Sequence, residues 1–524
     1  MSEPLPSAEL VERSEAEIVA EAFDPAFYLA TYPDVASYPG GPLQHFLDFG
    51  WRELRDPNAE FSTRAYVDAN PDVFDRGVNP LVHCLTSPRR LMSTRELRLG
   101  FRYEVIEGAI PMEIRLESFR RPVRTDPAAR LDAALATGRE GLRRLHVTFS
   151  HDDYTAGFGG VPITLQRESA GVAALGRDHL HLFPARPWQL VRTPQERGQL
   201  GVIWNGRRVG IFSPRTITAA LRRASAGPAA TRSFAIHSLL GHDADETADL
   251  LAALDLQAGY FWLHDFASLC AGFHLMRDDV EDCAAPPPDS AACGICLFGP
   301  WRRRHLEAHE RLFRRLRLTV ASPSEPTLTL WRRAWDFPTA GEVVAPHARL
   351  VRPRPDGPAR DGPFRLVYAG LTVPHKGWRV FRELALRAAE DPRYAFLHLG
   401  ASGEDGLPVE FHEVTATPER PEAMREALAA HRPDAVLVWP LCRETFSFTT
   451  HEAAAAGAAV VTGPDSGNVA AFVDATGLGV VLRSEEALLD AFRSGEILSL
   501  ARDRRAAESY DLAFSGLTAD LVAA

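Results

Sequence analysis

Glu444-Thr445-Phe446-Ser447-Phe448-Thr449-Thr450-His451-Glu452 is the stretch that decides the fold of the last third of this 524-residue chain. The apolar run 435–439 before it is typical of a buried strand, and so is the run 458–462 after it. Between them, residues 447–456 have the alanine-rich composition of a helix, closed by Gly457. Strand, loop, helix and strand in this order predict a doubly wound α/β domain.

The start of the predicted helix carries the first candidate binding site. Glu444 lies in the loop before the helix, and Glu452 lies about a turn and a half inside it. The free N–H groups of the first turn and the positive end of the helix dipole suit a diphosphate, while a carboxylate accepts hydrogen bonds from sugar or ribose hydroxyl groups. Two glutamates at this spacing are also common on solvated surfaces, so it is the preceding strand that makes the pair informative.

The same alternation of strands and helices extends upstream of this stretch. The predicted elements are a strand at 364–369, a loop at 370–377, a helix at 378–388, a strand at 394–399 and a helix near 421–430. The stretch 352–362, rich in Pro, Arg and Gly, is typical of a linker. We therefore predict a C-terminal Rossmann-like domain at 351–505, followed by a C-terminal helix at 506–524.

Lys376 is the only lysine among the 58 basic residues of the chain. It lies beside Gly377, just after the first predicted strand of the C-terminal domain. A compact ammonium group suits a diphosphate or a leaving oxygen where a planar guanidinium does not fit the same space. A lone surface lysine also arises by chance, but this position favours a functional role.

A second predicted α/β domain, at 141–350, begins with a glycine loop. Residues 144–150 predict a buried strand, and the loop after it ends in Gly159-Gly160 before an amphipathic helix from Val161 to about Leu175. Glycines at a helix start let a phosphate or a sugar approach backbone N–H groups. A Gly-Gly pair is equally compatible with a tight turn alone.

Further predicted strands place polar residues at the edge of the same sheet. These strands lie at 179–183, 201–212, 233–239, 260–264 and 316–321. The strand around Tyr260 to Leu263 ends in His264-Asp265, and ligands of open α/β sheets bind at the carboxyl ends of strands. His264 is therefore a candidate site residue, with a purely structural histidine as the alternative.

The N-terminal part contains an internal repeat with a period of 38 residues. Phe23, Tyr28, Pro33-Asp34-Val35, Pro42-Leu43, His45 and Leu47 recur as Phe61, Tyr66, Pro71-Asp72-Val73, Pro80-Leu81, His83 and Leu85. Each copy reads as a helix pair, with Asp24 as an N-cap and Pro42 at a helix start. We predict two helical repeats at 23–92 that pack their aromatic faces together. A disordered tail at 1–22 precedes them, and a linker at 93–140 with a strand-like segment from Phe101 to Leu116 follows.

Four cysteines in a segment rich in Pro, Asp and Gly suggest a structural metal. Cys270, Cys283, Cys293 and Cys296 have the spacing C-x12-C-x9-C-x2-C, and four thiolates satisfy tetrahedral zinc. Only one of the spacings is the diagnostic x2, so unligated thiols are the alternative. A catalytic metal is not expected here, because four protein thiolates leave no open position.

Composition and charge indicate an ordinary globular protein. The formal charge of -11 comes from 69 acidic and 58 basic residues spread along the chain, which argues against nucleic-acid binding. The first 22 residues lack the apolar core of a signal peptide, and no run of 18 uncharged apolar residues follows. We expect a cytoplasmic protein, a location that includes the inner face of the membrane. Six cysteines are too few for a disulfide scaffold.

The motifs of residues 144–505 together resemble those of retaining GT-B glycosyltransferases of the group 1, family 4-like type. Glu444-x7-Glu452 with its alanine-rich helix resembles their donor signature, Lys376-Gly377 their lysine-glycine motif, Gly159-Gly160 their acceptor-side loop and His264-Asp265 their donor-facing histidine. The N-terminal repeat resembles a module that precedes bacterial polysaccharide glycosyltransferases. The resemblance implies the GT-B fold, in which two Rossmann-like domains face a cleft, with the nucleotide sugar bound by the C-terminal domain.

The resemblance also implies a role for each matching residue. Glu444 would contact donor-sugar hydroxyls, Glu452 the ribose, and Lys376 the diphosphate, while His264 would touch the transferred sugar. The diphosphate would lie along the helix start formed by Phe446, Ser447, Phe448 and Thr449, with the N–H groups of Phe448 and Thr449 on its oxygens. A hexosyl or deoxyhexosyl group would pass with retention to a glycan, polysaccharide or protein-linked acceptor. The leaving diphosphate would help to deprotonate that acceptor, with no catalytic cofactor such as magnesium.

Two departures from the family pattern leave alternatives open. No arginine lies between Gly370 and His375, where the family commonly has one beside the diphosphate, and Arg379 is a candidate replacement. Ser447 stands where the family commonly has a glycine, and a serine fits at this position only if its φ is negative. A non-catalytic GT-B protein that binds glycan or serves as a scaffold, and a nucleotide-sugar epimerase, are the competing interpretations.

Overall fold

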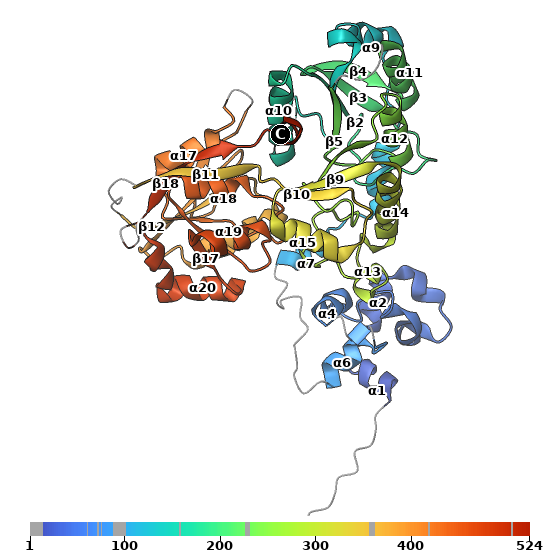
Figure 1. Ribbon diagram of the computed structural model, residues 1–524. Coiled ribbons are helices and arrows are strands. Elements are labelled where there is room, and N and C mark those ends of the chain that lie inside the picture. Colours follow the sequence, from blue (N-terminus) through green and yellow to red (C-terminus); the bar gives the residue numbers. More distant parts are fainter. Residues whose placement is uncertain are drawn as a thin grey trace, which may run out of the picture. The chain divides into compact units, whose positions relative to one another are not determined.

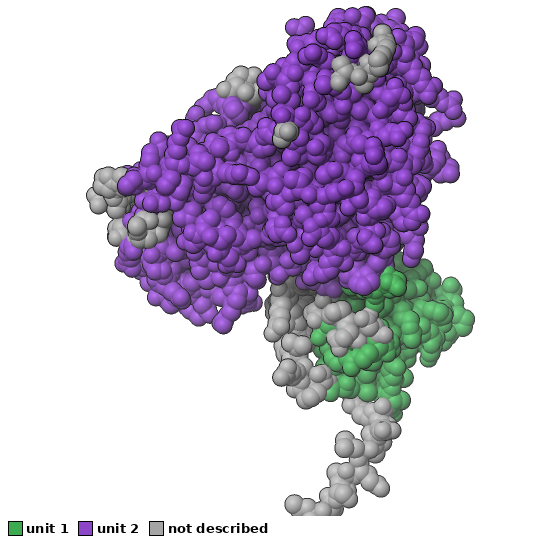
Figure 2. All heavy atoms as spheres, viewed as in Figure 1, with its two compact units in different colours: residues 1–109, 289–295 green, residues 110–288, 296–524 purple. Residues whose placement is uncertain are grey.

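The structure is a computed structural model that describes residues 14–59, 61–70, 73–74, 76–86, 101–156, 159–225, 231–355, 362–417, 420–502, 504 and 507–523. The chain forms two compact units, one of residues 1–109 and 289–295 and the other of residues 110–288 and 296–524 (Figure 2). The predicted tail up to residue 13, Pro71-Asp72 of the repeat, and residues 356–361 of the predicted linker lie outside the described residues.

The first unit is helical, and the two copies of the sequence repeat make equivalent side-chain contacts in it. Its helices are α1 (Glu15–Ala20), α2 (Pro25–Thr31), α3 (Gly41–His45), α4 (Thr63–Ala69), α6 (Pro80–Thr86), α7 (Phe101–Glu107) and α13 (Ala291–Gly294), with a 3-10 turn at Pro33–Ser37 and a π-turn at Phe46–Gly50. The Tyr28 hydroxyl lies 3.1 Å from Nδ1 of His45, and the Tyr66 hydroxyl lies 2.7 Å from Nδ1 of His83. Aromatic residues of both copies share one buried cluster.

Asp24 caps α2 as predicted, because its carboxylate accepts from the N–H groups of Ala26 and Phe27. Two other predictions about the first 140 residues are wrong. Residues 15–20 of the predicted disordered tail form α1. Ser14 and Glu17 form a capping box at the N-terminus of this helix. The strand-like segment Phe101 to Leu116 is helical, forming α7 and then α8 (Met112–Phe119).

The second unit contains two sheets, each with helices on its faces (Figure 1). The first sheet has the order β10-β9-β6-β5-β1-β2-β3-β4, in which only the β2-β3-β4 pairings are antiparallel. Its strands are β1 (Arg144–Phe149), β2 (Asp178–Pro184), β3 (Leu200–Trp204), β4 (Arg207–Phe212), β5 (Thr231–Ile236), β6 (Ala258–Trp262), β9 (Arg317–Ser322) and β10 (Gly341–Val344). The predicted strand 201–212 is thus a hairpin, turned at Asn205 and Gly206, which both have positive φ.

Helices connect these strands and bury one continuous apolar core. They are α9 (Ala128–Leu135), α10 (Gly160–Ala174), α11 (Pro214–Ala224), α12 (Ala244–Ala252), α14 (Gly299–Arg315) and α15 (Glu325–Ala334), and a small ribbon of β7 (Met276–Arg277) and β8 (Glu281–Asp282) lies between β6 and α14. β1, β5 and β6 are parallel, so their carboxyl ends meet at one edge of the sheet.

The second sheet has the order β14-β13-β12-β15-β16-β17, all parallel. This is the Rossmann order 3-2-1-4-5-6, and the doubly wound prediction is confirmed. Its strands are β12 (Phe364–Ala369), β13 (Tyr394–Gly400), β14 (Glu410–Glu413), β15 (Ala435–Leu437), β16 (Ala459–Thr462) and β17 (Gly479–Val481). Its helices are α16 (Trp378–Arg387), α17 (Ala423–His431), α18 (Phe448–Ala455), α19 (Asn468–Thr476) and α20 (Glu485–Ser494).

The chain passes between the two Rossmann-like domains twice. β11 (Ala348–Pro355) leads into the second domain and pairs antiparallel with β18 (Glu508–Phe514), after which α21 (Thr518–Ala523) packs on α10 of the first. The predicted helix at 506–524 is therefore wrong for residues 508–514, where Tyr510, Leu512 and Phe514 alternate as in a strand. Two Rossmann-like domains joined in this way give the α/β fold of the GT-B type. None of the described helices is both long and apolar enough to cross a membrane.

Candidate active site between two Rossmann-like domains

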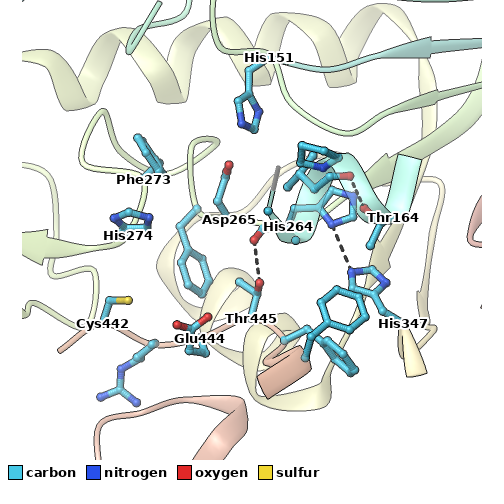
Figure 3. Close-up of a pocket in the computed structure, with 18 of the residues that line it drawn as sticks. His151, Thr164, His264, Asp265, Phe273, His274, His347, Cys442, Glu444 and Thr445 are labelled. Atoms are coloured by element: carbon cyan, nitrogen blue, oxygen red, sulfur yellow. Dashed lines mark hydrogen bonds between the residues drawn. The ribbon is translucent and has the colours of Figure 1, made fainter. Parts of the chain in front are cut away.

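A cavity of about 290 Å³ lies where the carboxyl edges of the two sheets face each other (Figure 3). The predicted site residues Gly159, Gly160, His264, Lys376, Glu444, Phe446 and Phe448 all line it. The other lining residues are His151, Asp152, Val161, Pro162, Thr164, Asp265, Phe266, Phe273, His274, His347, Cys442, Arg443 and Thr445. Residues that are far apart in sequence thus meet at one place, and both domains contribute to its wall.

Lys376 and Glu444 form an ion pair on the C-terminal wall. Nζ of Lys376 lies 2.5 Å from Oε1 of Glu444, and the two side chains are 43% and 14% exposed. Burial favours a lower pKa for Lys376, but the Glu444 carboxylate outweighs it and raises the pKa above its ordinary value. Gly377 has a φ of 84°, and a Cβ on it would come within 2.0 Å of the Trp439 carbonyl oxygen. The glycine is therefore required to place the lysine at the strand edge.

The backbone of Glu444 is held by the loop before α19. Its N–H donates to the Ser466 carbonyl at 3.3 Å, and its carbonyl accepts from the N–H of Asn468 at 2.9 Å. Ser447 caps α18, with its hydroxyl accepting from the N–H of Thr450. The φ of Ser447 is -116°, so a serine fits here without strain, as the sequence requires.

Ser447, Thr449 and Glu452, predicted to bind the donor, are not among the residues that line this cavity. Burial raises the pKa of the Glu452 carboxyl to about 7, against the opposing field of Arg167 from α10. Arg167 stacks on the Phe514 ring, with its guanidinium carbon 3.4 Å from the ring centroid. Glu452 therefore lies in a largely buried setting that it shares with a cation of the other domain.

The N-terminal wall is built from the ends of β1, β5 and β6. His151 follows β1, with Nε2 3.1 Å from the Asp152 carboxylate, and the pair raises the pKa of His151 although burial opposes this. Asp265 follows β6, and burial raises its pKa. Gly159 has a φ of 130°, so the loop before α10 needs a glycine there. Figure 3 shows His151 and Glu444 on opposite sides of the cavity, with Asp265 between them.

Both ring nitrogens of His264 are engaged by other histidines. Nε2 lies 2.6 Å from Nδ1 of His237, and Nδ1 lies 3.2 Å from Nε2 of His347. The carbonyl of His264 accepts from the Thr445 hydroxyl at 2.7 Å, which ties this wall to the donor motif. His264 therefore presents the edge and face of its ring to the cavity rather than a free N–H.

The structure does not gather the four cysteines of the zinc prediction into a metal-ligand set among the described residues. Among the described residues, no group of three or more His, Cys, Asp or Glu side chains is arranged to hold a metal ion. Burial raises the pKa of the Cys283 and Cys296 thiols to about 12, which opposes the thiolate form that zinc requires. No disulfide bond joins these four cysteines to one another or to Cys84 or Cys442, all of which are among the described residues.

Several cavity residues were missed at the sequence level. Arg443 lines the cavity and pairs with Asp282 at 2.8 Å, whereas Arg379, the candidate replacement for the missing arginine, does not line it. His274 stacks on His375 with ring centroids 4.7 Å apart, and burial lowers the pKa of His274 to about 3. His151-Asp152 was detectable, because it follows β1 as His264-Asp265 follows β6.

No protein-family model matches the sequence, and no curated protein matches it. Solved structures of similar shape include sucrose-phosphate synthase from Thermosynechococcus elongatus, with 15% identity over 68% of this chain and 91% of that one and a TM-score of 0.43. Anabaena HepE in complex with UDP-glucose has 12% identity over 72% and 98% of the two chains, with a TM-score of 0.43. WaaG, a glycosyltransferase of lipopolysaccharide biosynthesis, has 14% identity over 69% and 94%, with a TM-score of 0.37.

Proposed function

We propose that this chain is a retaining glycosyltransferase that moves a sugar from a nucleotide-diphosphate sugar to a glycan, polysaccharide or protein-linked acceptor. The observation that carries the proposal is the meeting of Lys376, Glu444 and the start of α18 at one cavity wall, at the carboxyl edge of a Rossmann-ordered sheet. A cation, a carboxylate and free helix N–H groups are the chemistry that a diphosphate next to a sugar needs.

Each wall then has a distinct task. Lys376 and the N–H group of Phe448, which both line the cavity, hold the diphosphate and stabilise the charge that develops as it leaves. The N–H group of Thr449, in the same first turn of α18, joins them if donor binding brings it to the cavity. Glu444, once the diphosphate competes for Lys376, is free to accept hydrogen bonds from sugar hydroxyls. The Gly159-Gly160 edge and His151 leave room for the acceptor on the N-terminal side. Glu452 binds the ribose only if donor binding brings it to the cavity.

The test is donor hydrolysis, because a transferase slowly passes its sugar to water when no acceptor is present. Purified protein is incubated with UDP-, GDP- and dTDP-hexoses, and free sugar and nucleotide are measured by NMR. We expect release from at least one donor with the sugar anomer retained, and loss of release in Lys376→Met. Arg387→Met is the matched control, since Arg387 lies at the other end of α16 and pairs with Glu383.

The competing functions give different results in the same assay. A scaffold that only binds glycan releases no sugar from any donor, which would contradict the proposal. An epimerase instead converts the donor into a second nucleotide sugar without an acceptor. Release of the sugar with the opposite anomeric configuration would still support a transferase, but it would contradict the retaining mechanism.

A further inference from the structure

Four side chains form a continuous line of hydrogen bonds behind the N-terminal wall of the cavity. Oε1 of Glu168 lies 2.9 Å from Nε2 of His237, whose Nδ1 lies 2.6 Å from Nε2 of His264. Nδ1 of His264 in turn lies 3.2 Å from Nε2 of His347. Glu168 comes from α10, and the histidines follow β5, β6 and β10. The line therefore runs from the core to the cavity wall.

The rings in this line are fixed by stacking. His237 and His264 lie 4.9 Å apart at 12°, and the Trp262 ring stacks on both at 6° and 10°. Glu168 and His237 are fully buried, and His347 is 3% exposed. Because ring contacts and hydrogen bonds hold the rings in this arrangement, each nitrogen keeps its partner, and only the positions of the protons remain to be decided.

Glu168 decides them, because an ionised carboxylate can only accept hydrogen bonds. Burial raises the pKa of Glu168, but His237 and His146 outweigh it and hold the pKa well below its ordinary value. Burial also holds the pKa of His264 well below 6.5, so the ring is neutral. For a neutral His237, the bond to this carboxylate requires that Nε2 donates and that Nδ1 accepts. His264 must then donate from Nε2 and accept at Nδ1.

We propose that Glu168 and His237 are positioning residues that hold His264 as a neutral ring protonated at Nε2. The effect on the reaction rests on the proposed function. Positive charge develops on the transferred sugar as its bond to the diphosphate breaks, and a cationic histidine at the wall would repel it. A neutral ring, backed by the buried negative charge of Glu168, lowers the energy of that transition state instead.

In the variant Glu168→Gln, the protons should lie on the opposite ring nitrogens from those of the wild type. The N–H of Thr518 donates to Oε2 of Glu168 at 2.9 Å, so the amide oxygen of glutamine must occupy that place. The amide NH₂ group then takes the Oε1 position and donates to Nε2 of His237. His237 becomes protonated at Nδ1, and His264 must shift its proton from Nε2 to Nδ1. One substitution of nearly the same shape thus reverses the direction of the whole line.

Histidine-selective ¹⁵N NMR measures this directly and needs no substrate. The signals of His264 are assigned by their loss in His264→Gln, and the chemical shifts of its two nitrogens report which one is protonated. We expect Nε2–H in the wild type, Nδ1–H in Glu168→Gln and Nε2–H in Ser169→Ala. Ser169 is the control because it neighbours Glu168 on α10 and bonds a different buried histidine, His179, at 3.0 Å.

Protonation of wild-type His264 at Nδ1, or on both nitrogens, overturns the proposal, even if Glu168→Gln does not fold. An unchanged His264 tautomer in a folded Glu168→Gln protein also overturns it. In the donor-hydrolysis assay, Glu168→Gln should lower kcat on the order of tenfold while KM stays unchanged. If no donor is hydrolysed at all, the proposed function fails, while the tautomer result still decides the positioning role.

Discussion

Nζ of Lys376, the only lysine of the chain, lies 2.5 Å from Oε1 of Glu444. The two residues come from different loops, one after β12 and one after β15, and they neutralise each other at the cavity wall. A bound diphosphate competes with Glu444 for the ammonium group. Under the proposed function, one ligand therefore both satisfies the lysine and releases the carboxylate toward the sugar.

Because the chain has one lysine, the ion pair is accessible to a single-residue measurement. Lysine-selective NMR gives one side-chain signal, and its titration should yield a pKa above 10.5, since Glu444 favours the charged form. In Glu444→Gln this pKa should fall, because burial then acts without an opposing carboxylate. Glu413→Gln, an exposed carboxylate change on β14, should leave it in place. A Lys376 pKa that is equal in all three proteins would show that the ion pair does not form in solution.

Ser447 should tolerate glycine better than alanine. Its hydroxyl caps α18, and losing an N-cap hydroxyl to alanine costs about 1 kcal/mol, whereas glycine costs a few tenths of that. Urea unfolding of Ser447→Ala and Ser447→Gly against wild type measures the difference. Equal free energies of unfolding for all three proteins would mean that the cap does not stabilise the donor helix.

Glu452 should make the protein less stable as the pH rises from about 4.5 to about 7. The folded state keeps its carboxyl proton up to about pH 7, whereas the unfolded chain releases it near 4.5, so the folded state binds more protons in this range. Glu452→Gln cannot ionise and should gain in Tm relative to wild type across it. Thermal unfolding at a series of pH values tests this, with Glu413→Gln as the control. A Tm difference that does not change with pH would contradict the buried, neutral carboxyl.

The cysteine segment should be free of metal. Protein purified under reducing conditions from zinc-supplemented medium should contain zinc well below one equivalent by elemental analysis, since the thiols are not arranged as a ligand set. Cys283 and Cys296 should also react slowly with thiol reagents at neutral pH, because their raised pKa leaves almost no thiolate. One bound zinc ion per protein molecule that is lost in Cys283→Ser would contradict this prediction and support the zinc hypothesis.

The sequence predicted those features that depend on local pattern. The strand at 364–369, the cap of α2 and the strand-edge positions of His264 and Lys376 follow from apolar runs and from the turn and capping residues between them. The strand-like prediction for residues 101–116 was wrong because the alternating apolar residues there also fit helical spacing. Met112 and Leu116, four residues apart, are both buried.

Long-range partners could not be predicted in this way. No motif or spacing marks Glu168, His237 and His347 in the sequence, and only the strand order brings them to His264. The zinc hypothesis has the same limit, since spacing along the chain does not state distance in space. Arg443 was overlooked because it precedes Glu444 without any spacing signal of its own.

The most direct test of the central claim is calorimetric titration of UDP, GDP, dTDP and CMP into the wild type and Lys376→Met. If the wall of Lys376, Glu444 and the α18 start binds a nucleotide diphosphate, at least one of the three diphosphates binds the wild type more tightly than CMP. Lys376→Met should then weaken that binding roughly tenfold or more, as loss of a charge-assisted contact requires. Equal affinity in both proteins, or no binding of any diphosphate to the wild type, would contradict the account.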